Sequence, residues 1–339
     1  MTVPAEIVAA WGWQNAELAP VPGGLINATY AVRIGGVAIA VIQRLHTIFH
    51  PSVNFDIDAV TKHVIARGVP VPRLLLTQAG EAWQEHDGRI WRALSWIDGT
   101  TVHRVPDPSW AHAGGMLVGR FHRAVSDLEY RYAFVRAGVH DTVAHLGRLA
   151  EHVESGADPE AVELGRAIMS VATSLPELPI TAKRHCHGDL KISNLLFDAG
   201  GAVTAVALLD LDTLGQGTMA FELGDALRSW CNPLGEDAGE IRFELPIFAA
   251  AITGFRSVAD DLLTRDERTS IVLGLETVCV ELSARFAVDV FRDEYFGWDP
   301  TRFSSRRAHN LVRARGQLAL AAAVRAARQD ALDVVLAGA

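Results

Sequence analysis

Residues 187–198 read HGDLKISNLLFD, and LLDLDT follows at 208–213. Both stretches contain apolar runs, and a Gly-Gly turn lies between them. Two apolar runs around such a turn predict an antiparallel hairpin. A hairpin brings the loop before its first strand next to the end of its second strand. We therefore expect Asp189, Asn194 and Asp210 to lie close together.

Oxygen-bearing side chains in this arrangement suit one kind of chemistry. Transfer of a phosphoryl group from a nucleotide needs a carboxylate that positions and deprotonates the acceptor hydroxyl. It also needs hard oxygen ligands for Mg²⁺ and a cation that meets the charge of the moving group. Asp189 can supply the carboxylate, and Asn194 and Asp210 can supply the ligands. The spacing predicts a phosphoryl-transfer site.

The rest of the chain divides into a strand-rich and a helical part. Residues 1–98 contain apolar runs around turns such as Gly35-Gly36, which predict a mostly antiparallel sheet with one helix. Residues 99–339 have apolar positions at helical spacing. We predict an α+β, two-lobed fold with a boundary at residue 98. The expected strands are 28–34, 37–45, 74–76, 90–97, 194–197 and 203–211, and the expected helices are 54–67, 109–128, 140–154, 158–174, 244–262, 267–292 and 310–336.

Composition excludes several classes of protein. The chain has 339 residues, of which 31 are Lys or Arg and 40 are Asp or Glu, giving a net charge of −9. A nucleic-acid partner would require a basic surplus or stripe. No apolar run has the length of a membrane span, and the N-terminus lacks the basic region of a signal peptide. Three widely spaced cysteines fit neither a disulfide framework nor a zinc site. We expect a cytoplasmic protein without nucleic-acid or membrane partners, as a monomer or homodimer.

A set of motifs resembles those of the aminoglycoside phosphotransferase/choline kinase superfamily, which has a protein-kinase-like fold. The resemblance is closest to the branch of N-acetylhexosamine 1-kinases, which share an INxTY loop, a QR pair on the third strand and a late HNLxRxR. It implies ATP and Mg²⁺ as cofactors, a nucleotide-binding lobe at 1–98 and a catalytic, substrate-binding lobe at 99–339. The motifs are PGGLINATY (22–30), SWIDG (95–99), GRFHR (119–123), HGDLKISN (187–194), LLDLDT (208–213), ELGDALR (222–228) and RAHNLVRAR (307–315).

The resemblance also implies roles for single residues. Asp189 would be the catalytic base, and Lys191 would face the transferring phosphate. Asp212 would add a carboxylate near the metal ligands Asn194 and Asp210, or else cap a turn. His187 and Asp225 would support the catalytic loop. The loop over the phosphates would contain Gly23, Gly24, Asn27 and Thr29, and Ser95 and Ile97 would offer backbone groups to the adenine.

One departure from the kinase pattern concerns the third strand. Kinase-like folds carry a lysine there, paired with a helix glutamate, whereas this chain has Gln43 and Arg44. Successive strand residues face opposite sides, so only one of them can face the nucleotide. Arg44 could bind phosphate through two N–H groups, with Gln43 as a neutral substitute. The helix offers Asp56 or Asp58 in place of glutamate.

The identity of the acceptor depends on weaker signals. Arg285 and Asp289 resemble a sugar-binding helix motif, although their spacing also fits an exposed ion pair. The best acceptor is a small-molecule hydroxyl on a hexose or amino sugar. Aminoglycoside, choline and homoserine kinases would use the same machinery, and a catalytically silent nucleotide-binding protein is a further alternative. The motifs DFG and APE are absent from the sequence, which argues against a protein kinase.

Overall fold

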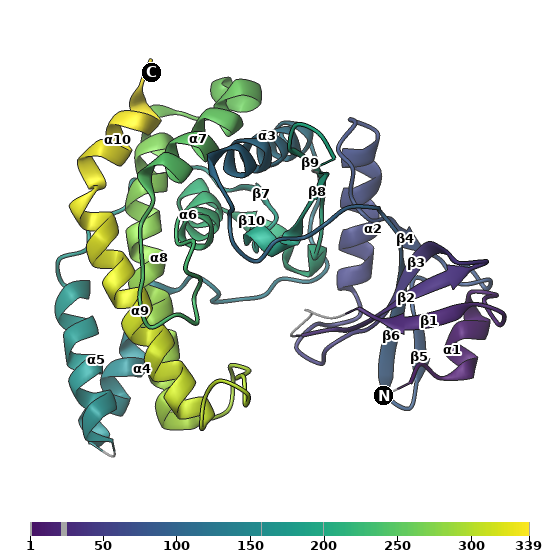
Figure 1. Cartoon of the computed structure of the whole chain (residues 1–339), viewed down its shortest axis with the longest axis horizontal. Coiled ribbons are helices and arrows are strands. Elements are labelled where there is room, and N and C mark those ends of the chain that lie inside the picture. Colours follow the sequence, from purple (N-terminus) through teal and green to yellow (C-terminus); the bar gives the residue numbers. More distant parts are fainter. Residues whose placement is uncertain (1, 22–25, 157, 199, 339) are drawn as a thin grey trace.

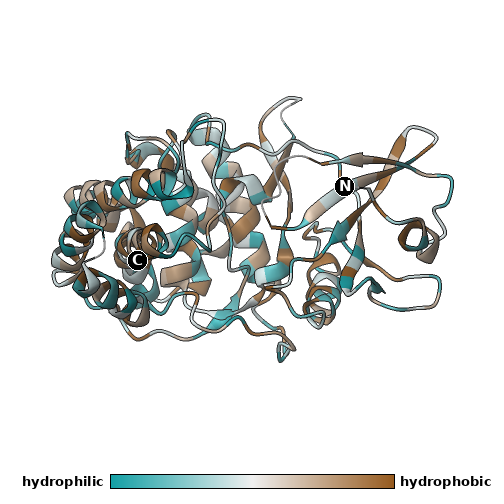
Figure 2. Ribbon diagram, turned by 90° about the horizontal axis from the view of Figure 1, so that it is seen from below, coloured by the Kyte–Doolittle hydropathy of each residue, from teal (hydrophilic) through white to brown (hydrophobic). Residues whose placement is uncertain are grey.

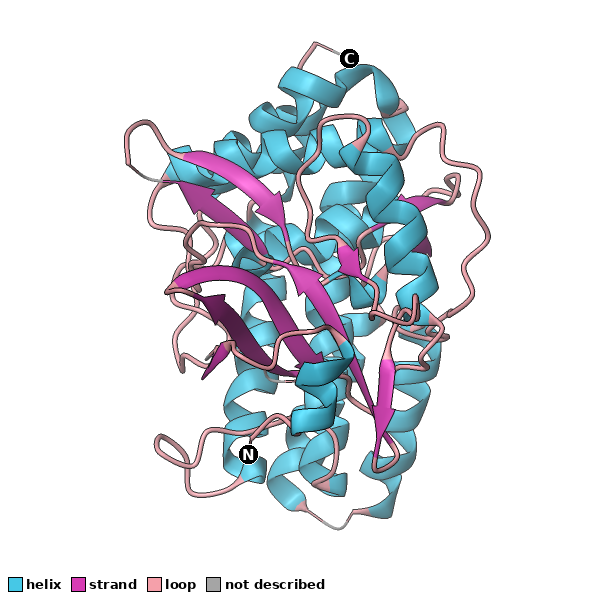
Figure 3. Cartoon of the chain, turned by 90° about the vertical axis from the view of Figure 1, so that its right-hand side faces the viewer, coloured by secondary structure: helices cyan, strands magenta, loops and turns pink. Residues whose placement is uncertain are grey.

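The computed structural model describes residues 2–21, 26–156, 158–198 and 200–338. A sheet lobe with the N-terminus and a helical lobe with the C-terminus lie along the long axis (Figure 1). Seen from the sheet side, strands lie in front of the C-lobe helices (Figure 3). Two glycines of the expected phosphate loop, Gly23 and Gly24, lie outside the described residues.

The N-lobe sheet is antiparallel, with strand order β1-β2-β3-β6-β4 and with β5 paired to β6. The β2–β3 hairpin turns at Gly35 and Gly36, whose φ values of 57° and 81° suit residues without a Cβ. Tyr30, Val32 and Ile42 pack with Ile7 of α1 on one face of the sheet. The elements are α1 (Ala5–Ala10), β1 (Glu17–Pro20), β2 (Ala28–Ile34), β3 (Val37–Arg44), β4 (Leu74–Leu75), β5 (Gln84–His86) and β6 (Arg89–Ser95).

Helix α2 (Val53–Ile65) lies between the sheet and the C-lobe (Figure 1). Its residues Ile57, Val60 and Val64 are buried in the main hydrophobic core, which also contains Leu94 of β6. The apolar stripe of α2 therefore joins the sheet to the core of the larger lobe.

The C-lobe is a bundle of helices whose starts are set by local caps. Asp107 accepts the N–H of Ser109 at the start of α3, and Thr264 and Glu267 form a capping box at the start of α8. Hydrophobic residues are spread over the helices of this lobe and the strands of the sheet (Figure 2). The helices are α3 (Pro108–Ala124), α4 (Thr142–Ser155), α5 (Pro159–Ala172), α6 (Met219–Trp230), α7 (Leu245–Ala259), α8 (Arg265–Arg292), α9 (Arg306–Ala326) and α10 (Arg328–Leu336).

Glycine allows α3 and α7 to approach each other closely. A Cβ on Gly115 would lie 2.1 Å from the carbonyl oxygen of Ala251, and one on Gly254 would lie 2.1 Å from that of His112. Both distances are far inside van der Waals contact, so larger side chains would force the two helices apart.

Two short antiparallel pairs carry the central motif. β7 (Arg184–Cys186) pairs with β10 (Gly215–Gly217), and β8 (Leu195–Asp198) pairs with β9 (Thr204–Leu208). The 3₁₀ turns η1 (Ile192–Asn194) and η2 (Leu211–Thr213) lie next to these strands, and η3 (Asp260–Leu262) follows α7.

The two-lobed α+β architecture and the central hairpin are confirmed. Helix α6 was not predicted, and Gly224, a poor helix former, lies in its centre. A Cβ on Gly224 would lie 2.8 Å from the Leu275 nitrogen of α8, which explains this glycine. The expected helix 310–336 is two helices that meet at Ala327. The lobe boundary at residue 98 stays a prediction. Among the described residues, no helix is long and apolar enough to cross a membrane.

Candidate active site

The loop 187–194 and Asp210 meet because two strand pairs hold their ends. β7 leads into this loop and β8 follows it, while β9 ends two residues before Asp210. The N–H of Leu209 donates to the carbonyl oxygen of Asn194 at 2.7 Å, which extends the β8–β9 ladder. The hairpin therefore brings Asp189, Asn194 and Asp210 to one place.

Asp189 is held by two donors on one of its oxygens. The Asn194 amide nitrogen donates to the main-chain oxygen of Asp189 at 2.8 Å and to Oδ2 at 3.1 Å. Lys191 Nζ donates to the same Oδ2 at 2.8 Å. Among the described residues, none donates a hydrogen bond to Oδ1 of Asp189. The side chains of Asp189 and Lys191 are 26% and 41% exposed, so a substrate can reach both.

Asp210 combines an unusual backbone with a perturbed carboxyl. Its φ is 59°, in the left-handed region that non-glycine residues adopt mainly where the surrounding structure requires it. The side chain is 40% exposed, with Oδ2 lying 4.0 Å from Lys191 Nζ. Desolvation, together with the carboxylates of Asp212 and Asp189, nevertheless raises the pKa of Asp210 to about 7. Desolvation alone would lower the pKa of Lys191, but Asp189 and Asp210 raise it.

This cluster fits a divalent cation of the magnesium type. The Asn194 amide nitrogen faces Asp189, so its carbonyl oxygen points elsewhere, and Asp210 adds carboxylate oxygens. Mg²⁺ prefers such hard oxygen ligands and keeps further positions for water and phosphate. In the described part of the chain, no group of three or more His, Cys, Asp or Glu residues could hold a metal ion. A magnesium site here would therefore rely on nucleotide phosphates as additional ligands.

Glu222 of α6 holds the catalytic loop through two hydrogen bonds to its backbone. Its two oxygens accept the backbone N–H groups of His187 and Gly188, at 2.8 and 2.9 Å. His122 Nε2 lies 3.2 Å from Oε1 of the same carboxylate. Burial alone would raise the pKa of Glu222, but the contacts with His122 and His187 hold it below its ordinary value. The prediction that Asp225 supports the loop is therefore wrong. Its carboxylate accepts a hydrogen bond from Arg228 Nε at 2.8 Å, and Glu222 is the residue that supports the loop.

On the N-lobe side, Gln43 and not Arg44 faces the catalytic hairpin. Gln43 Oε1 accepts from Arg92, which is paired with Asp212, and its nitrogen donates to Thr29 Oγ1 at 3.1 Å. Adjacent strand residues point to opposite faces, so Arg44 lies on the face that α1 covers. This placement favours Gln43 as the strand residue that faces the nucleotide.

The carboxylates of α2 have other partners than the strand. Asp56 is buried and accepts from Tyr130 OH at 2.8 Å and from the N–H groups of Ala133 and Phe134 at 2.7 and 2.9 Å. Asp58 forms an i,i+4 ion pair with the exposed Lys62. The expected substitute for the kinase helix glutamate therefore does not point toward the sheet.

Two further expected nucleotide contacts lie after β6. The N–H of Ser95 donates to Arg73 O at 2.8 Å, and Ser95 Oγ accepts the N–H of Arg73 at 2.9 Å. Ile97 follows in the extended connection to the C-lobe, and its N–H donates no hydrogen bond to another described residue. Ile97 therefore has a backbone donor available for a ligand.

The predicted substrate residues Arg285 and Asp289 have different surroundings. Asp289 is buried, where it accepts the N–H groups of residues 294–296 at 2.8 to 3.1 Å and the Asn310 amide at 2.9 Å. It stabilises the turn after α8. Arg285 is half-buried with its guanidinium over the ring of Phe296, and no carboxylate of the described residues forms an ion pair with it. The two residues do not pair with each other.

Arg285 belongs to a charged group near the catalytic cluster. The pKa of the desolvated Asp225 carboxyl is lowered by Arg228, His140 and Arg285. Asp225 in turn contributes to the raised pKa of Lys191. Asp225 therefore links this group electrostatically to the residues around Asp189.

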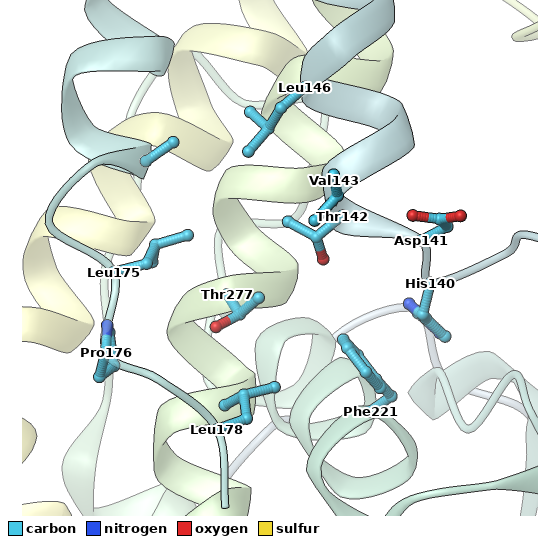
Figure 4. A pocket seen from close by; sticks show the side chains of 11 residues that line it. His140, Asp141, Thr142, Val143, Leu146, Leu175, Pro176, Leu178, Phe221 and Thr277 are labelled. Carbon is cyan, nitrogen blue, oxygen red and sulfur yellow. The ribbon is translucent and has the colours of Figure 1, made fainter.

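A separate cavity of about 510 Å³ lies beside α4, α6 and α8 (Figure 4). Its walls are mainly apolar, including Leu146, Leu175, Leu178 and Phe221, with His140 at one side. None of the candidate catalytic or metal-binding residues lines it. We therefore do not assign it to the reaction.

Sequence reasoning missed Arg92 and Glu222. Arg92 stands in the apolar strand sequence IWRAL and is 1% exposed. A charge in such a strand requires a buried partner, and that signal could have identified it. Glu222 lies in the motif ELGDALR, whose sequence alone does not tell which of its two acidic residues faces the loop.

Known proteins resemble this chain in sequence pattern and in fold. A family model described as "Phosphotransferase enzyme family" matches residues 17–257. An amicoumacin kinase in complex with AMP-PNP, Ca²⁺ and Ami is 14% identical, with a TM-score of 0.63 over 92% of this chain and 91% of that chain. A microcompartment-associated aminopropanol kinase is 15% identical, with a TM-score of 0.63 over 97% and 98%. A choline kinase from Cryptosporidium parvum Iowa II is 10% identical, with a TM-score of 0.64 over 98% and 96%. These similarities show a shared kinase-like fold.

Proposed function

Because the chain belongs to the phosphotransferase enzyme family, we propose that it transfers the γ-phosphate of ATP to a hydroxyl group of a small molecule. The observation that carries this proposal is the cluster of Asp189, Lys191, Asn194 and Asp210 at one end of the β8–β9 hairpin. Each side chain has a type that phosphoryl transfer requires, and Asp189 and Lys191 are accessible to substrates.

Asp189 positions the acceptor and takes its proton. Lys191 and Asn194 bond Oδ2, so Oδ1 is available to accept a hydrogen bond from the acceptor hydroxyl. Through this hydrogen bond Asp189 directs the hydroxyl oxygen toward the γ-phosphorus and takes up its proton as the new P–O bond forms, while the bond to the bridging oxygen breaks and ADP leaves.

Asn194 and Asp210 would hold Mg²⁺ through their side-chain oxygens. When bound, the ion offsets negative charge on the phosphates. Lys191 is a fixed cation beside both aspartates, and we propose that it stabilises the charge that develops on the transferred group.

The N-lobe supplies the nucleotide contacts in this proposal. Backbone groups of Ser95 and Ile97 would meet the adenine, and Asn27 and Thr29 would lie near the phosphates with Gly23 and Gly24. We include Gln43 in place of Arg44, because Gln43 faces the catalytic hairpin.

We propose a neutral, hydroxyl-rich acceptor, such as a hexose or an N-acetylated amino sugar. Arg228 pairs with Asp225 and Glu236, and His140 Nδ1 lies 3.1 Å from Glu281 Oε1, so each of these carboxylates already has a side-chain partner. Arg285 has no carboxylate partner among the described residues. A neutral polyol can bond both Arg285 and Asp225, whereas a cationic acceptor would be repelled by Arg285. Asp289 is not part of this site, because it stabilises the neighbouring turn.

A cationic acceptor is the second candidate. Two structural neighbours are an aminopropanol kinase and a choline kinase, and both of these alcohols carry a cationic nitrogen. A catalytically silent nucleotide-binding protein is the third candidate, and the accessible cluster around Asp189 is the observation against it.

The test measures ADP release from MgATP with a panel of hexoses, N-acetylhexosamines, aminoglycosides, choline and homoserine. We expect turnover with a neutral sugar and its loss in Asp189→Asn. Asp198→Asn, at the exposed end of β8, is the matched control and should behave as the wild type. Turnover only with a cationic compound would refute the proposal of a neutral acceptor. ATP binding without any turnover would support a catalytically silent nucleotide-binding protein.

A further inference from the structure

A buried ion pair joins the two lobes behind the proposed nucleotide site. The side chains of Arg92 on β6 and Asp212 in η2 are each 1% exposed. Arg92 Nη1 donates to Asp212 Oδ1, and Nη2 donates to Oδ2 at 2.9 Å. Nε and Nη2 of Arg92 also donate to Gln43 Oε1, at 2.9 and 2.7 Å. The guanidinium is thus fixed by the neighbouring strand and by the C-lobe.

Asp212 also holds the segment that leads into β2. The Asn27 amide nitrogen donates to Asp212 Oδ2 at 2.6 Å. On its other side, Asn27 Oδ1 accepts the N–H of His46 at 2.8 Å. Asn27 is 7% exposed, and its amide therefore bridges His46, two residues after β3, and the C-lobe.

The position of this ion pair differs from that of protein kinases. There, the lysine of the third strand pairs with a glutamate of the following helix, and the pair must form for activity. In this chain Gln43 occupies the strand and Asp56 of α2 faces the C-lobe. The buried charge pair instead connects β6 with the segment that carries Asp210.

We propose that Arg92 and Asp212 are positioning residues for the metal and nucleotide, an inference that rests on the proposed function. Their ion pair fixes the η2 turn directly after Asp210 and, through Asn27, the entry to β2. Arg92 and Asn27 occupy both oxygens of Asp212, so Asp212 acts through its neighbours and is not a metal ligand. The ion pair thereby sets the distance between Asn27, at the entry to β2, and the metal ligand Asp210.

The arrangement requires the guanidinium fork. Arginine can bond both oxygens of Asp212 and Gln43 at once, whereas lysine has a single compact charge. A buried charge without its partner destabilises a fold, but replacing both charges by apolar residues of similar size is often tolerated. The double variant Arg92→Met/Asp212→Leu therefore separates loss of position from loss of folding.

The test measures ATP affinity with and without Mg²⁺ by calorimetry. It compares the wild type with Arg92→Lys, Asp212→Asn and the double variant; Arg89→Gln, exposed on the same strand, is the control. We expect the affinity for MgATP to fall about 10- to 100-fold in the three variants, as for other groups that orient metal ligands. Affinity for metal-free ATP should change little. Hydrogen exchange at the His46 amide should become faster in Asp212→Asn and in the double variant, because Asn27 loses its anchor.

The possible outcomes distinguish a positioning role of the ion pair from a purely structural role and from metal binding by Asp212. A folded double variant with wild-type MgATP affinity would overturn the proposal, even with faster exchange at His46, because the ion pair would then be structural only. Loss of MgATP affinity in Asp212→Asn without loss in Arg92→Lys would also overturn it and return Asp212 to the metal ligands. Wild-type protein that binds no ATP would contradict the proposed function itself, and this is seen before any variant is compared.

Discussion

His187 Nε2 donates a hydrogen bond to the main-chain oxygen of Leu209 at 2.8 Å, which ties the start of the catalytic loop to the residue before Asp210. His187 Nδ1 accepts the N–H of Asp189 at 3.3 Å, so one neutral tautomer satisfies both bonds. Burial lowers the pKa of His187, which keeps this form in the folded protein.

This tautomer predicts a loss of stability in weak acid. The unfolded chain takes up a proton at His187 near its ordinary pKa of about 6.5, whereas the folded protein resists it, so the free energy of unfolding falls as the pH drops below that value. Urea unfolding at several pH values should show a smaller decline between neutral and weakly acidic pH in His187→Gln than in the wild type. His50→Gln, an exposed site, is the control. Equal declines in wild type and His187→Gln would refute the prediction.

Glu222→Gln should weaken the support of the catalytic loop. A glutamine offers one carbonyl oxygen and one amide group, so one of the N–H groups of His187 and Gly188 loses its acceptor. We expect a loss of about 1–3 kcal/mol in the free energy of unfolding. Urea denaturation measures it, with the exposed Glu151→Gln as control. A variant with wild-type stability would show that other groups hold the loop.

The raised pKa of Asp210, about 7, predicts that the magnesium requirement depends on pH. Below this pKa the carboxyl is mostly protonated, so metal binding must displace a proton. The Mg²⁺ concentration for half-maximal ATP binding should therefore be roughly tenfold higher at pH 6 than at pH 8. Titrations at the two pH values test this, and an unchanged or inverted requirement would exclude Asp210 as the titrating ligand. Asp198→Asn should follow the wild type.

Arg285→Leu should affect the acceptor and not the nucleotide. Its guanidinium is the cation that we propose to bond the acceptor, and hydrogen bonds to charged groups contribute about 1.5–3 kcal/mol. The KM for the acceptor should rise at least about tenfold, with little change in the KM for ATP. Arg292→Leu, on the same helix, removes an exposed ion pair and should change neither. An equal effect of both variants would indicate a general loss of structure.

Two glycine substitutions should change stability in opposite directions. Gly115→Ala places a Cβ 2.1 Å from Ala251 O, and such overpacking costs about 1–3 kcal/mol. Gly147 of α4 has no neighbour within 4 Å of its ideal Cβ, so Gly147→Ala should stabilise the helix by about 0.5–1 kcal/mol. Thermal unfolding of both variants tests the expected decrease in stability for Gly115→Ala and the expected increase for Gly147→Ala. A stabilised Gly115→Ala would mean that α3 and α7 can separate without cost.

Sequence reasoning identified the features that depend on local spacing. The catalytic hairpin, its three polar residues and most helices follow from turn residues and apolar periodicity within short segments. The partner of Arg92 lies 120 positions away in the sequence, and that of Asn27 lies 185 positions away. Such pairings result from the packing of the lobes and leave no periodic signal. The choice between Gln43 and Arg44 likewise depended on which face α1 covers.

Helix α2 has more polar anchors on the C-lobe than on the sheet. Asp56 accepts hydrogen bonds from Tyr130 OH and from the N–H of Ala133, and His63 Nε2 donates to Ala124 O at 3.0 Å. On the sheet side, Arg92 Nη1 donates to Asn54 Oδ1 at 3.4 Å. Mechanically, α2 is therefore fixed to the larger lobe and forms one unit with it. Separation of the sheet from this unit would have to break the buried Arg92–Asp212 ion pair and the hydrogen bond from Asn27 to Asp212.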